Sequence, residues 1–435
     1  MRGNARRQFL KGCATAAVAG GMFSVSSGAG ATTDRRTGTD ELRTQPPEMA
    51  TGWSTNRGDY GRTAAVGSVD GFESGFDFDA LETDWTTDVE ALPVVADGTA
   101  YLSVEGVVHA FDTTDGALEW RSEDIGASGQ PTAAYETVYV GGDGIVTALD
   151  AATGDVRWQT AVVGADHAAI EALTVAFGMV YALAEGSLTA IDCESGSVEW
   201  ARESISVSVG GPAGEQSNVN RALQRCVASA DGRIFTIAEA GTIAAFDPLT
   251  GTSELAIETD YYYLYDLVAT DGTVFVRTES EVVAAYDSTT GEREELWHGG
   301  VRQVAVSEDT LAFATRYELV AVDLETGDER WTVGKYSHAF GDPVIADDAV
   351  LVSLGLQGGR YENSLVAFDV DTGRERWIFS RTKSATVGER CVVADRTVYI
   401  DDGGLTAIRT PSRDSENGDD QGDDQTQMCP GENGD

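Results

Sequence analysis

The sequence has little positive charge and almost no lysine. Its 435 residues include 72 Asp and Glu against 30 Lys and Arg, so the formal net charge is −42. Only three of the basic residues are lysines, at positions 11, 335 and 383. A surface this acidic repels nucleic-acid phosphates and anionic lipid headgroups, which excludes a nucleic-acid-binding function.

Long apolar runs are also missing. No stretch reaches the ~18 apolar residues of a membrane-spanning helix, so the sequence predicts no membrane span and excludes a helical channel or transporter. Acidic residues instead run through the whole chain beside an ordinary hydrophobic content of 42%, which indicates a folded domain. This composition is typical of proteins from halophiles, in which molar salt screens the repulsion. An acidic secreted protein is the alternative.

Cysteine is scarce, and its spacing predicts no metal site. No two of the five cysteines are adjacent, and no pair has the C-x-x-C spacing of metal ligands. They are Cys13, Cys193, Cys226, Cys391 and Cys429. The last four are compatible with disulfides in an exported protein, and equally with burial as small hydrophobic side chains. The sequence does not choose a pairing.

Residues 1–31 differ from the rest of the chain, with four basic residues and no acidic one. Positions 6–11 read Arg-Arg-Gln-Phe-Leu-Lys, which resembles the twin-arginine export signal. A weakly apolar stretch to about Phe23 and a small-x-small cleavage site at 29–31 follow. We therefore expect an extracellular or cell-surface protein, its signal either cleaved or retained as an anchor. Cleavage leaves 26 basic and 72 acidic residues, a net charge of −46.

An eleven-residue motif of the form A-x-D-x-x-T-G-x-x-x-W recurs seven times. Copies start at positions 110, 148, 190, 245, 285, 321 and 367, with Asp or Ser replacing Thr in the first and third. Two copies are degraded, since Leu255 stands in the Trp place and Trp297 comes two residues late. The motif aspartates lie 38, 42, 55, 40, 36 and 46 residues apart, the spacing of propeller blades with loop insertions.

The motif has a physical interpretation as a turn between two strands. An alternating apolar stretch precedes each Asp and predicts a strand. The Asp carboxylate accepts N–H groups of the turn, and the Gly four residues later takes the positive φ that closes the hairpin. The Trp begins the next strand, where its ring fills the gap between adjacent sheets. We therefore assign these residues a structural role.

The residues with this structural role are tryptophans, aspartates and glycines. The tryptophans are Trp85, Trp120, Trp158, Trp200, Trp331 and Trp377. The aspartates are Asp112, Asp150, Asp192, Asp247, Asp287, Asp323 and Asp369. The glycines are Gly116, Gly154, Gly196, Gly251, Gly291, Gly327 and Gly373.

Two ends of the chain are expected to complete one blade. The last segment ends at Arg409, where the motif Asp is expected, and no Trp follows. The strand around Trp85 has no partner of its own near the N-terminus and can supply the missing outer strand. The sequence thus predicts an all-β fold, an eight-bladed β-propeller of four-stranded antiparallel blades closed by N- and C-terminal strands. Such closure removes free sheet edges.

The motif resembles the tryptophan-docking motif of the PQQ-repeat (quinoprotein-like, BamB-like) β-propeller family. The stretch from Trp53 to Thr63 also resembles the W-x5-D-x3-T lead-in of such propellers. The resemblance covers about 53–409, and the composition suggests an exported haloarchaeal member. The family includes PQQ-dependent alcohol dehydrogenases and BamB-type scaffold lipoproteins, so it implies the fold and leaves the activity open.

Four segments are expected along the chain. They are a signal peptide at 1–31, a disordered linker at 32–50, the propeller at 51–410 and an acidic disordered tail at 411–435.

A PQQ-dependent dehydrogenase is one hypothesis for the function. The resemblance implies that members binding PQQ have longer chains, a disulfide between adjacent cysteines, a Trp floor and a Glu/Asn/Asp calcium site. This chain has no Cys-Cys pair, and the repeat or its lead-in accounts for all eight tryptophans. The four histidines, at 109, 167, 298 and 338, are far apart in sequence. We expect neither PQQ nor a metal, and no catalytic residue.

A non-catalytic scaffold that binds a protein or peptide partner, and is itself a monomer, is the interpretation we favour. Propellers bind through the face where interblade loops converge on the channel. Three departures from the repeat map there: residues 201–225, the tyrosine-rich run 261–265 and the insertion 356–363. Tyr and Arg are enriched at the energetic centres of protein interfaces.

The candidate partner-binding residues come from these loops and from the starts of inner strands. They are Arg225, Arg302, Arg390, Tyr262, Tyr263, Arg360 and Tyr361. The first three are expected around one channel mouth, where they would attract an acidic peptide or a carboxylate ligand. Pairing of these arginines with neighbouring carboxylates is the alternative, as is coverage of a blade edge by the tyrosines.

Overall fold

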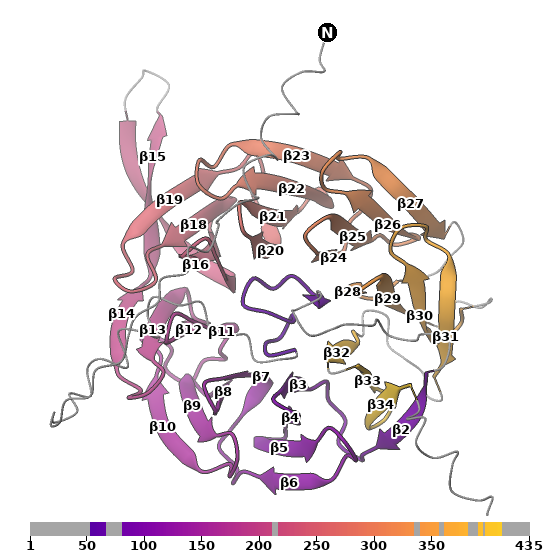
Figure 1. The fold of residues 1–435 in the computed structure, drawn as a ribbon. Coiled ribbons are helices and arrows are strands. Elements are labelled where there is room, and N and C mark those ends of the chain that lie inside the picture. Colours follow the sequence, from indigo (N-terminus) through magenta and orange to yellow (C-terminus); the bar gives the residue numbers. More distant parts are fainter. Residues whose placement is uncertain are drawn as a thin grey trace, which may run out of the picture.

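The computed structural model of the protein describes residues 53–66, 81–210, 216–334, 340–355, 361–381, 390–394 and 396–410. These residues form 34 strands in eight sheets, which stand around a common axis (Figure 1). The predicted eight-bladed β-propeller is confirmed. The expected signal, linker and acidic tail lie outside the described residues. Within the described part of the chain, no helix could cross a membrane.

Blades 1 to 3 follow one another along the chain, each with its first strand nearest the axis. Blade 1 comprises β3 (Val94–Ala96), β4 (Thr99–Val104), β5 (Val107–Asp112) and β6 (Leu118–Arg121). Blade 2 comprises β7 (Ser128–Ala134), β8 (Thr137–Gly142), β9 (Ile145–Asp150) and β10 (Val156–Ala161). Blade 3 comprises β11 (Ala172–Ala176), β12 (Met179–Ala184), β13 (Ser187–Asp192) and β14 (Val198–Arg202).

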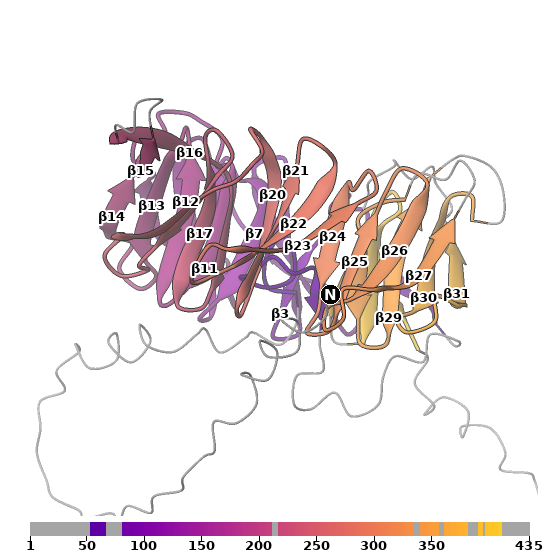
Figure 2. The same cartoon turned by 90° about the horizontal axis from the view of Figure 1, so that it is seen from above.

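Blade 4 carries an extra strand. It comprises β15 (Ser204–Gly210), β16 (Gln216–Ala230), β17 (Arg233–Ala238), β18 (Thr242–Phe246) and β19 (Ser253–Glu258). Because β15 pairs with the first half of β16 and β17 with the second half, the β15–β16 hairpin extends beyond the blade. It projects at the upper left of Figures 1 and 2.

Blades 5 to 7 repeat the four-stranded pattern. Blade 5 comprises β20 (Leu264–Thr270), β21 (Thr273–Thr278), β22 (Val282–Asp287) and β23 (Arg293–His298). Blade 6 comprises β24 (Gln303–Val306), β25 (Thr310–Ala314), β26 (Glu318–Asp323) and β27 (Glu329–Gly334). Blade 7 comprises β28 (Val344–Ala346), β29 (Ala349–Leu354), β30 (Ser364–Asp369) and β31 (Glu375–Ser380), with β1 (Ala65–Val66) parallel to β28.

Blade 8 joins the two ends of the propeller. Its inner strands are β32 (Val392–Ala394), β33 (Thr397–Asp401) and β34 (Leu405–Arg409), and its outer strand is β2 (Glu82–Thr86). Strand β2 pairs antiparallel with β34, and Trp85 lies opposite Ala407. The predicted closure by N- and C-terminal strands is therefore present.

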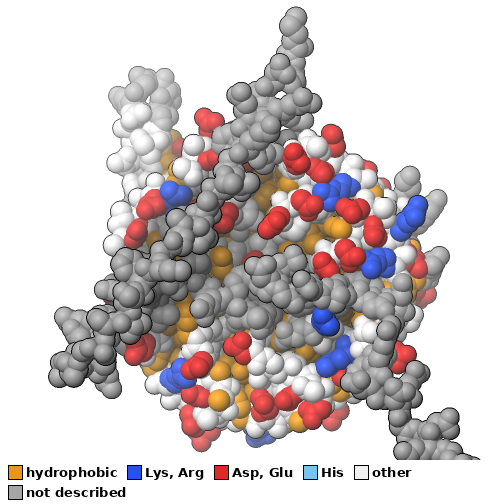
Figure 3. Space-filling view, in the orientation of Figure 1, with side chains coloured by type: hydrophobic (Ala, Val, Ile, Leu, Met, Phe, Trp, Pro, Cys, Tyr) orange, Lys and Arg blue, Asp and Glu red, His pale blue; other side chains and the backbone are white. Residues whose placement is uncertain are grey.

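Burial is greatest in the middle strands of each blade and falls at the rim. Every residue of β8 and β12 is buried, whereas β10 at the rim of blade 2 has none. The apolar clusters combine side chains of neighbouring blades, such as Trp200 of blade 3 with Phe246 of blade 4. The core is thus a ring of interblade seams. Acidic side chains are spread over the face of the ring seen in Figure 3.

Candidate functional site

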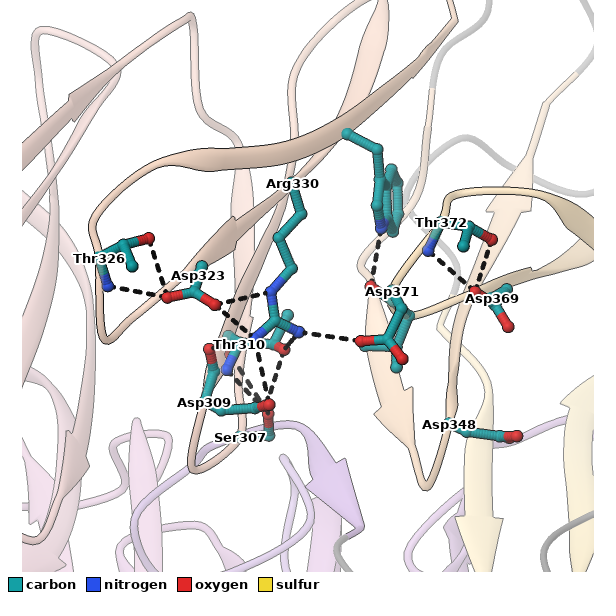
Figure 4. Close-up of polar contacts among 12 residues, drawn as sticks. Ser307, Asp309, Thr310, Asp323, Thr326, Arg330, Asp348, Asp369, Asp371 and Thr372 are labelled. Carbon is teal, nitrogen blue, oxygen red and sulfur yellow. Dashed lines mark hydrogen bonds and ion pairs between the residues drawn. The ribbon is translucent and has the colours of Figure 1, made fainter.

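The seven motif turns share one geometry, shown for two blades in Figure 4. The Oδ1 atom of Asp323 accepts hydrogen bonds from the backbone N and Oγ1 of Thr326, at 2.8 and 3.0 Å. The N–H of Gly327 donates to the carbonyl of Asp323 at 2.7 Å, and its φ is +72°. All seven motif glycines donate to the carbonyl of their motif Asp and have positive φ.

Five of the listed tryptophans cross a seam and pack on the motif turn of the next blade. Trp331 Nε1 donates to the carbonyl of Val370 at 2.7 Å, and a Cβ on Gly373 would lie 2.7 Å from the ring. Trp85, Trp120, Trp158 and Trp200 donate in the same way. These contacts leave room only for glycine in the turn, so the motif supplies stability between blades.

The degraded copies depart from this packing. Beyond Leu255, Ile257 lies against the next motif glycine, Gly291. Trp297 stacks on Phe275 of its own blade, with ring centroids 6.3 Å apart, and Trp377 stacks on Phe379.

Residues 53–66 fill the axis of the propeller and are called the axis segment here (centre of Figure 1). Their carbonyl groups accept hydrogen bonds from inner-strand N–H groups of six blades. The pairs are Val95 with Trp53, Ala133 with Ser54, Ser229 with Tyr60, Ala269 with Gly61, Val306 with Thr63, and Ile345 with Ala64, at 2.8 to 3.0 Å. The lead-in recognised in the sequence therefore lies on the axis and is hydrogen-bonded to six of the eight blades.

The axis segment is held by a buried ion cluster. Arg57, 3% exposed, donates to Asp266 Oδ2 at 3.1 Å, and Arg62 donates to Asp266 Oδ1 at 2.9 Å. Arg57 also donates to Gln303 and to the carbonyl of Val304. Burial raises the pKa of Asp266, but the charges of Arg57 and Arg62 outweigh it, so the pKa lies below its ordinary value. Asp266 is thus an anion shared by two arginines.

Arg390 also contacts the axis segment. Its guanidinium donates to the carbonyl and Oδ1 of Asn56 at 2.9 and 2.7 Å, and to Gln130 Oε1 at 3.1 Å. Asp342 lies 3.7 Å away. Burial and the neighbouring charge of Arg57 lower the pKa of Arg390. This candidate binding residue is therefore engaged in closing the channel.

Three of the four tyrosines of the 261–265 loop face solvent, while Tyr261 packs against the apolar core. Tyr262 and Tyr263 are 62% and 50% exposed and pack edge to face, with centroids 4.7 Å apart. Their backbone N–H groups both donate to the Glu279 carboxylate at 2.9 Å, which fixes the loop. Tyr265 is 39% exposed and lies 5.3 Å from the Arg225 guanidinium and 5.1 Å from that of Arg277.

The other candidate binding residues are distributed over several blades. Arg302 is exposed just before β24, and its N–H donates to the carbonyl of Ala314. Tyr361 in blade 7 packs edge to face on Phe368, 6.0 Å away, against the apolar core. Arg360 lies outside the described residues. The structure thus brings Arg225 together with the tyrosine loop, and places Arg390 on the axis and Tyr361 in a separate blade.

The cysteines and histidines show no grouping in the described part of the chain. Cys193, Cys226 and Cys391 are free and buried, and burial raises the pKa of each thiol to about 12. Burial and then Arg121 lower the pKa of His109, while a contact with Asp143 raises that of the exposed His167. No three His, Cys, Asp or Glu side chains among the described residues converge on a metal position.

Sequence reasoning missed the ion cluster around Asp266 and the pairing of Tyr265 with Arg277. Arg57 and Arg62 lie in the lead-in, and two arginines five residues apart in so acidic a chain were an available signal. Tyr265 and Arg277 carried no such signal, because their meeting depends on the register between β20 and β21.

The chain belongs to the β-propeller family described as outer membrane protein assembly factor BamB. Two matches to the family profile cover residues 79–220 and 210–408. No curated protein matches the sequence.

Solved structures share the fold at low sequence identity. Quinohemoprotein alcohol dehydrogenase from Comamonas testosteroni is 16% identical, with a TM-score of 0.60 over 86% of this chain and 83% of that one. BamB from Moraxella catarrhalis is 18% identical, with a TM-score of 0.57 over 76% of this chain and 97% of that one. A europium-containing methanol dehydrogenase is 14% identical, with a TM-score of 0.57 over 84% and 91%. The likeness therefore concerns the fold alone.

Proposed function

We propose that this protein is an exported, non-catalytic scaffold that binds a protein or peptide partner through the loop face over blades 4 to 6. The binding surface is the tyrosine–arginine patch, defined as Arg225, Tyr262, Tyr263, Tyr265 and Arg302. The resemblance of residues 6–11 to a twin-arginine export signal supports an extracellular or cell-surface location. Membership of the family described as outer membrane protein assembly factor BamB is consistent with a scaffold role.

One observation carries this proposal: exposed tyrosines lie on a loop whose backbone is fixed by hydrogen bonds, and one of them, Tyr265, lies beside Arg225. The Glu279 carboxylate holds the N–H groups of Tyr262 and Tyr263, and two residues on, the carbonyl of Glu281 accepts from Val301, next to Arg302. Tyr and Arg bury large contact areas at the centres of interfaces. Holding them before binding reduces the entropic cost of association.

A PQQ-dependent dehydrogenase is the alternative, because two of the structural neighbours named above are an alcohol and a methanol dehydrogenase. Within the described part of the chain, the tryptophans and the residues at the channel mouth do not fit a quinone stacked on a tryptophan beside a metal ion. Trp53 is buried in the axis segment, and the Arg390 guanidinium donates a hydrogen bond to Asn56. The other tryptophans pack at or near the blade seams. We therefore derive no catalytic step through PQQ.

Partner capture tests the scaffold proposal. Wild-type protein and the triple variant Tyr262→Ala/Tyr263→Ala/Arg302→Ala are used as bait in high-salt membrane and culture-fluid extracts, with mass spectrometry of the captured proteins. The matched control is Val156→Ala/Val198→Ala, which removes side chains that are 50% and 42% exposed beside motif turns. The triple variant should fold normally and lose a partner that the wild type and the control retain.

Two results would overturn the proposal. One is unchanged capture by the triple variant. The other is a stoichiometric quinone in the absorption spectrum of the purified protein together with alcohol-dependent dye reduction, which would establish the dehydrogenase.

A further inference from the structure

Two guanidinium groups share one tyrosine ring at the channel mouth. Arg225 of blade 4 and Arg277 of blade 5 lie 5.3 and 5.1 Å from the ring centroid of Tyr265. The ring face attracts each cation, but two like charges at one ring also repel each other. An anion between the guanidiniums would relieve that repulsion.

Neither guanidinium has a hydrogen-bond or ion-pair partner among the described residues. The Nε atom of Arg277 is shielded from solvent and makes no hydrogen bond. A guanidinium carries five N–H donors, and a donor removed from water without an acceptor costs free energy. The Nε atom of Arg277 is thus a shielded donor without an acceptor, and the exposed Arg225 guanidinium has no carboxylate partner among the described residues, in a chain with a net charge of −42.

The carboxylates around the ring are already engaged. Asp266 is held by Arg57 and Arg62, and Asp342 lies 3.7 Å from Arg390. Glu279 accepts the backbone N–H groups of the tyrosine loop, and Glu171 accepts the backbone N–H of Arg225 at 3.3 Å. Asp266 and Asp342 attract Arg277 electrostatically, but none of these carboxylates hydrogen-bonds to either guanidinium, so both remain available to a carboxylate of a bound partner.

Backbone irregularities on two adjacent blades aim these side chains at each other. The pairing of β16 shifts between Gln224 and Val227, and Arg225 within this shift has a φ of +77°. The pairing of β20 shifts between Leu264 and Asp266, which leaves Tyr265 as the extra residue. Bulges redirect side chains next to functional sites, and a non-glycine residue at positive φ stores strain. Blade 4 thus holds Arg225 at a strained φ, and blade 5 holds Tyr265 in a bulge.

We propose that Arg225 and Arg277, stacked on Tyr265, form a clamp for the carboxylate groups of an acidic peptide segment. The clamp rests on the proposed function and names the chemistry of its partner. The planar guanidinium fork matches a carboxylate in two-bonded geometry. Exposed Tyr262 and Tyr263 stand beside it and supply apolar area that a free small anion would not use.

Calorimetric titration of the full chain tests the clamp, at the lowest salt concentration at which the protein stays folded. The probe is a short peptide of alternating Glu and Gly, and its comparison is the same peptide with Gln for Glu. The acidic peptide should bind and the Gln peptide should not. Arg225→Gln/Arg277→Gln should weaken binding by about tenfold or more, and each single variant should weaken it less.

Arg202→Gln is the matched control. Arg202 also lies over an aromatic ring, 5.7 Å from Trp200, but its guanidinium donates to the carbonyls of Ala201, Thr250 and Gly251. It should bind the acidic peptide as the wild type does. If the double variant does not fold, as shown by circular dichroism, Arg225→Gln and Arg277→Lys replace it, because Lys keeps the charge but lacks the fork.

Equal binding of the two peptides, or full binding by the double variant, would overturn the clamp. So would inorganic phosphate or glutarate competing as strongly as the peptide, which would assign the site to a small anion. Failure of the clamp is separable from failure of the proposed function. If the Tyr262/Tyr263/Arg302 variant loses capture while Arg225→Gln/Arg277→Gln binds the peptide fully, only the clamp is contradicted. If the clamp binds the peptide but the Tyr262/Tyr263/Arg302 variant captures the partner unchanged, only the tyrosine–arginine patch is contradicted.

Discussion

Single glycines determine how closely adjacent blades approach. Gly196 has a φ of +71°, and a Cβ there would lie 2.7 Å from the Trp158 ring, whereas Gly126 has a φ of +68° and nothing within 4 Å of its Cβ position. Both Ala substitutions place a side chain at positive φ, which costs roughly 1–2 kcal/mol. Gly196→Ala should lower the free energy of unfolding by a further ~1–3 kcal/mol, because it overpacks the seam. Urea unfolding at fixed molar salt measures this difference, and equal losses would contradict it.

Asp266 makes the attachment of the axis segment dependent on pH. Because its pKa is lowered in the fold by Arg57 and Arg62, its contribution to stability is present above the ordinary value of 3.8 and is lost as the pH falls below it. Asp266→Asn leaves two buried arginines without an anion and should cost ~3–5 kcal/mol at neutral pH. The variant should also lose less further stability than the wild type on acidification.

Urea unfolding at pH 7 and at acidic pH measures both effects. Asp143→Asn is the control, since it also removes one carboxylate but from an exposed pair with His167, and it should change the free energy of unfolding little. Parallel pH profiles for the wild type and Asp266→Asn would contradict the assignment.

At the scale of elements, the axis segment and β2 make different contributions to the ring. A chain that starts at residue 81 lacks the axis segment but keeps β2, and one that starts at residue 88 lacks both. The first should lower the melting temperature, because six blades lose a backbone acceptor and Asp266 loses Arg57 and Arg62. The second should lower it further, because β34 becomes a free edge. Removal of 411–435 is the control and should have little effect. Equal melting temperatures for the three chains would contradict the split blade.

The strands and turns could be predicted from the sequence where the local turn motif and the closure of the ring indicate the same structure. Each motif Asp and Gly lies in the expected turn because the hydrogen bonds it makes are local, and the two ends of blade 8 followed from one missing and one surplus strand. The axis segment could not be placed in this way. Residues such as Ser54 and Thr63 are polar, and their position depends on inner-strand N–H groups that only the closed ring presents. The bulges at Arg225 and Tyr265 could not be predicted either, because the repeat pattern assumes regular strand pairing.

At the scale of the whole molecule, the acidic surface sets the condition for folding. Residues 32–435 carry a net charge of −46, and the described ion pairs engage only a minority of the acidic residues. At ~0.1 M salt the Debye length is ~10 Å, so charges on neighbouring blades still repel each other, while at ~1 M it falls to ~3 Å.

We therefore expect a cooperative, β-rich unfolding transition at molar salt that disappears below about 0.1 M. Circular dichroism during dilution of the salt measures it, with sucrose at equal osmolarity as the control. Sucrose strengthens burial without screening charge, so it should not replace the salt. A cooperative β-rich fold that persists below that concentration would show that the blade seams alone outweigh the repulsion.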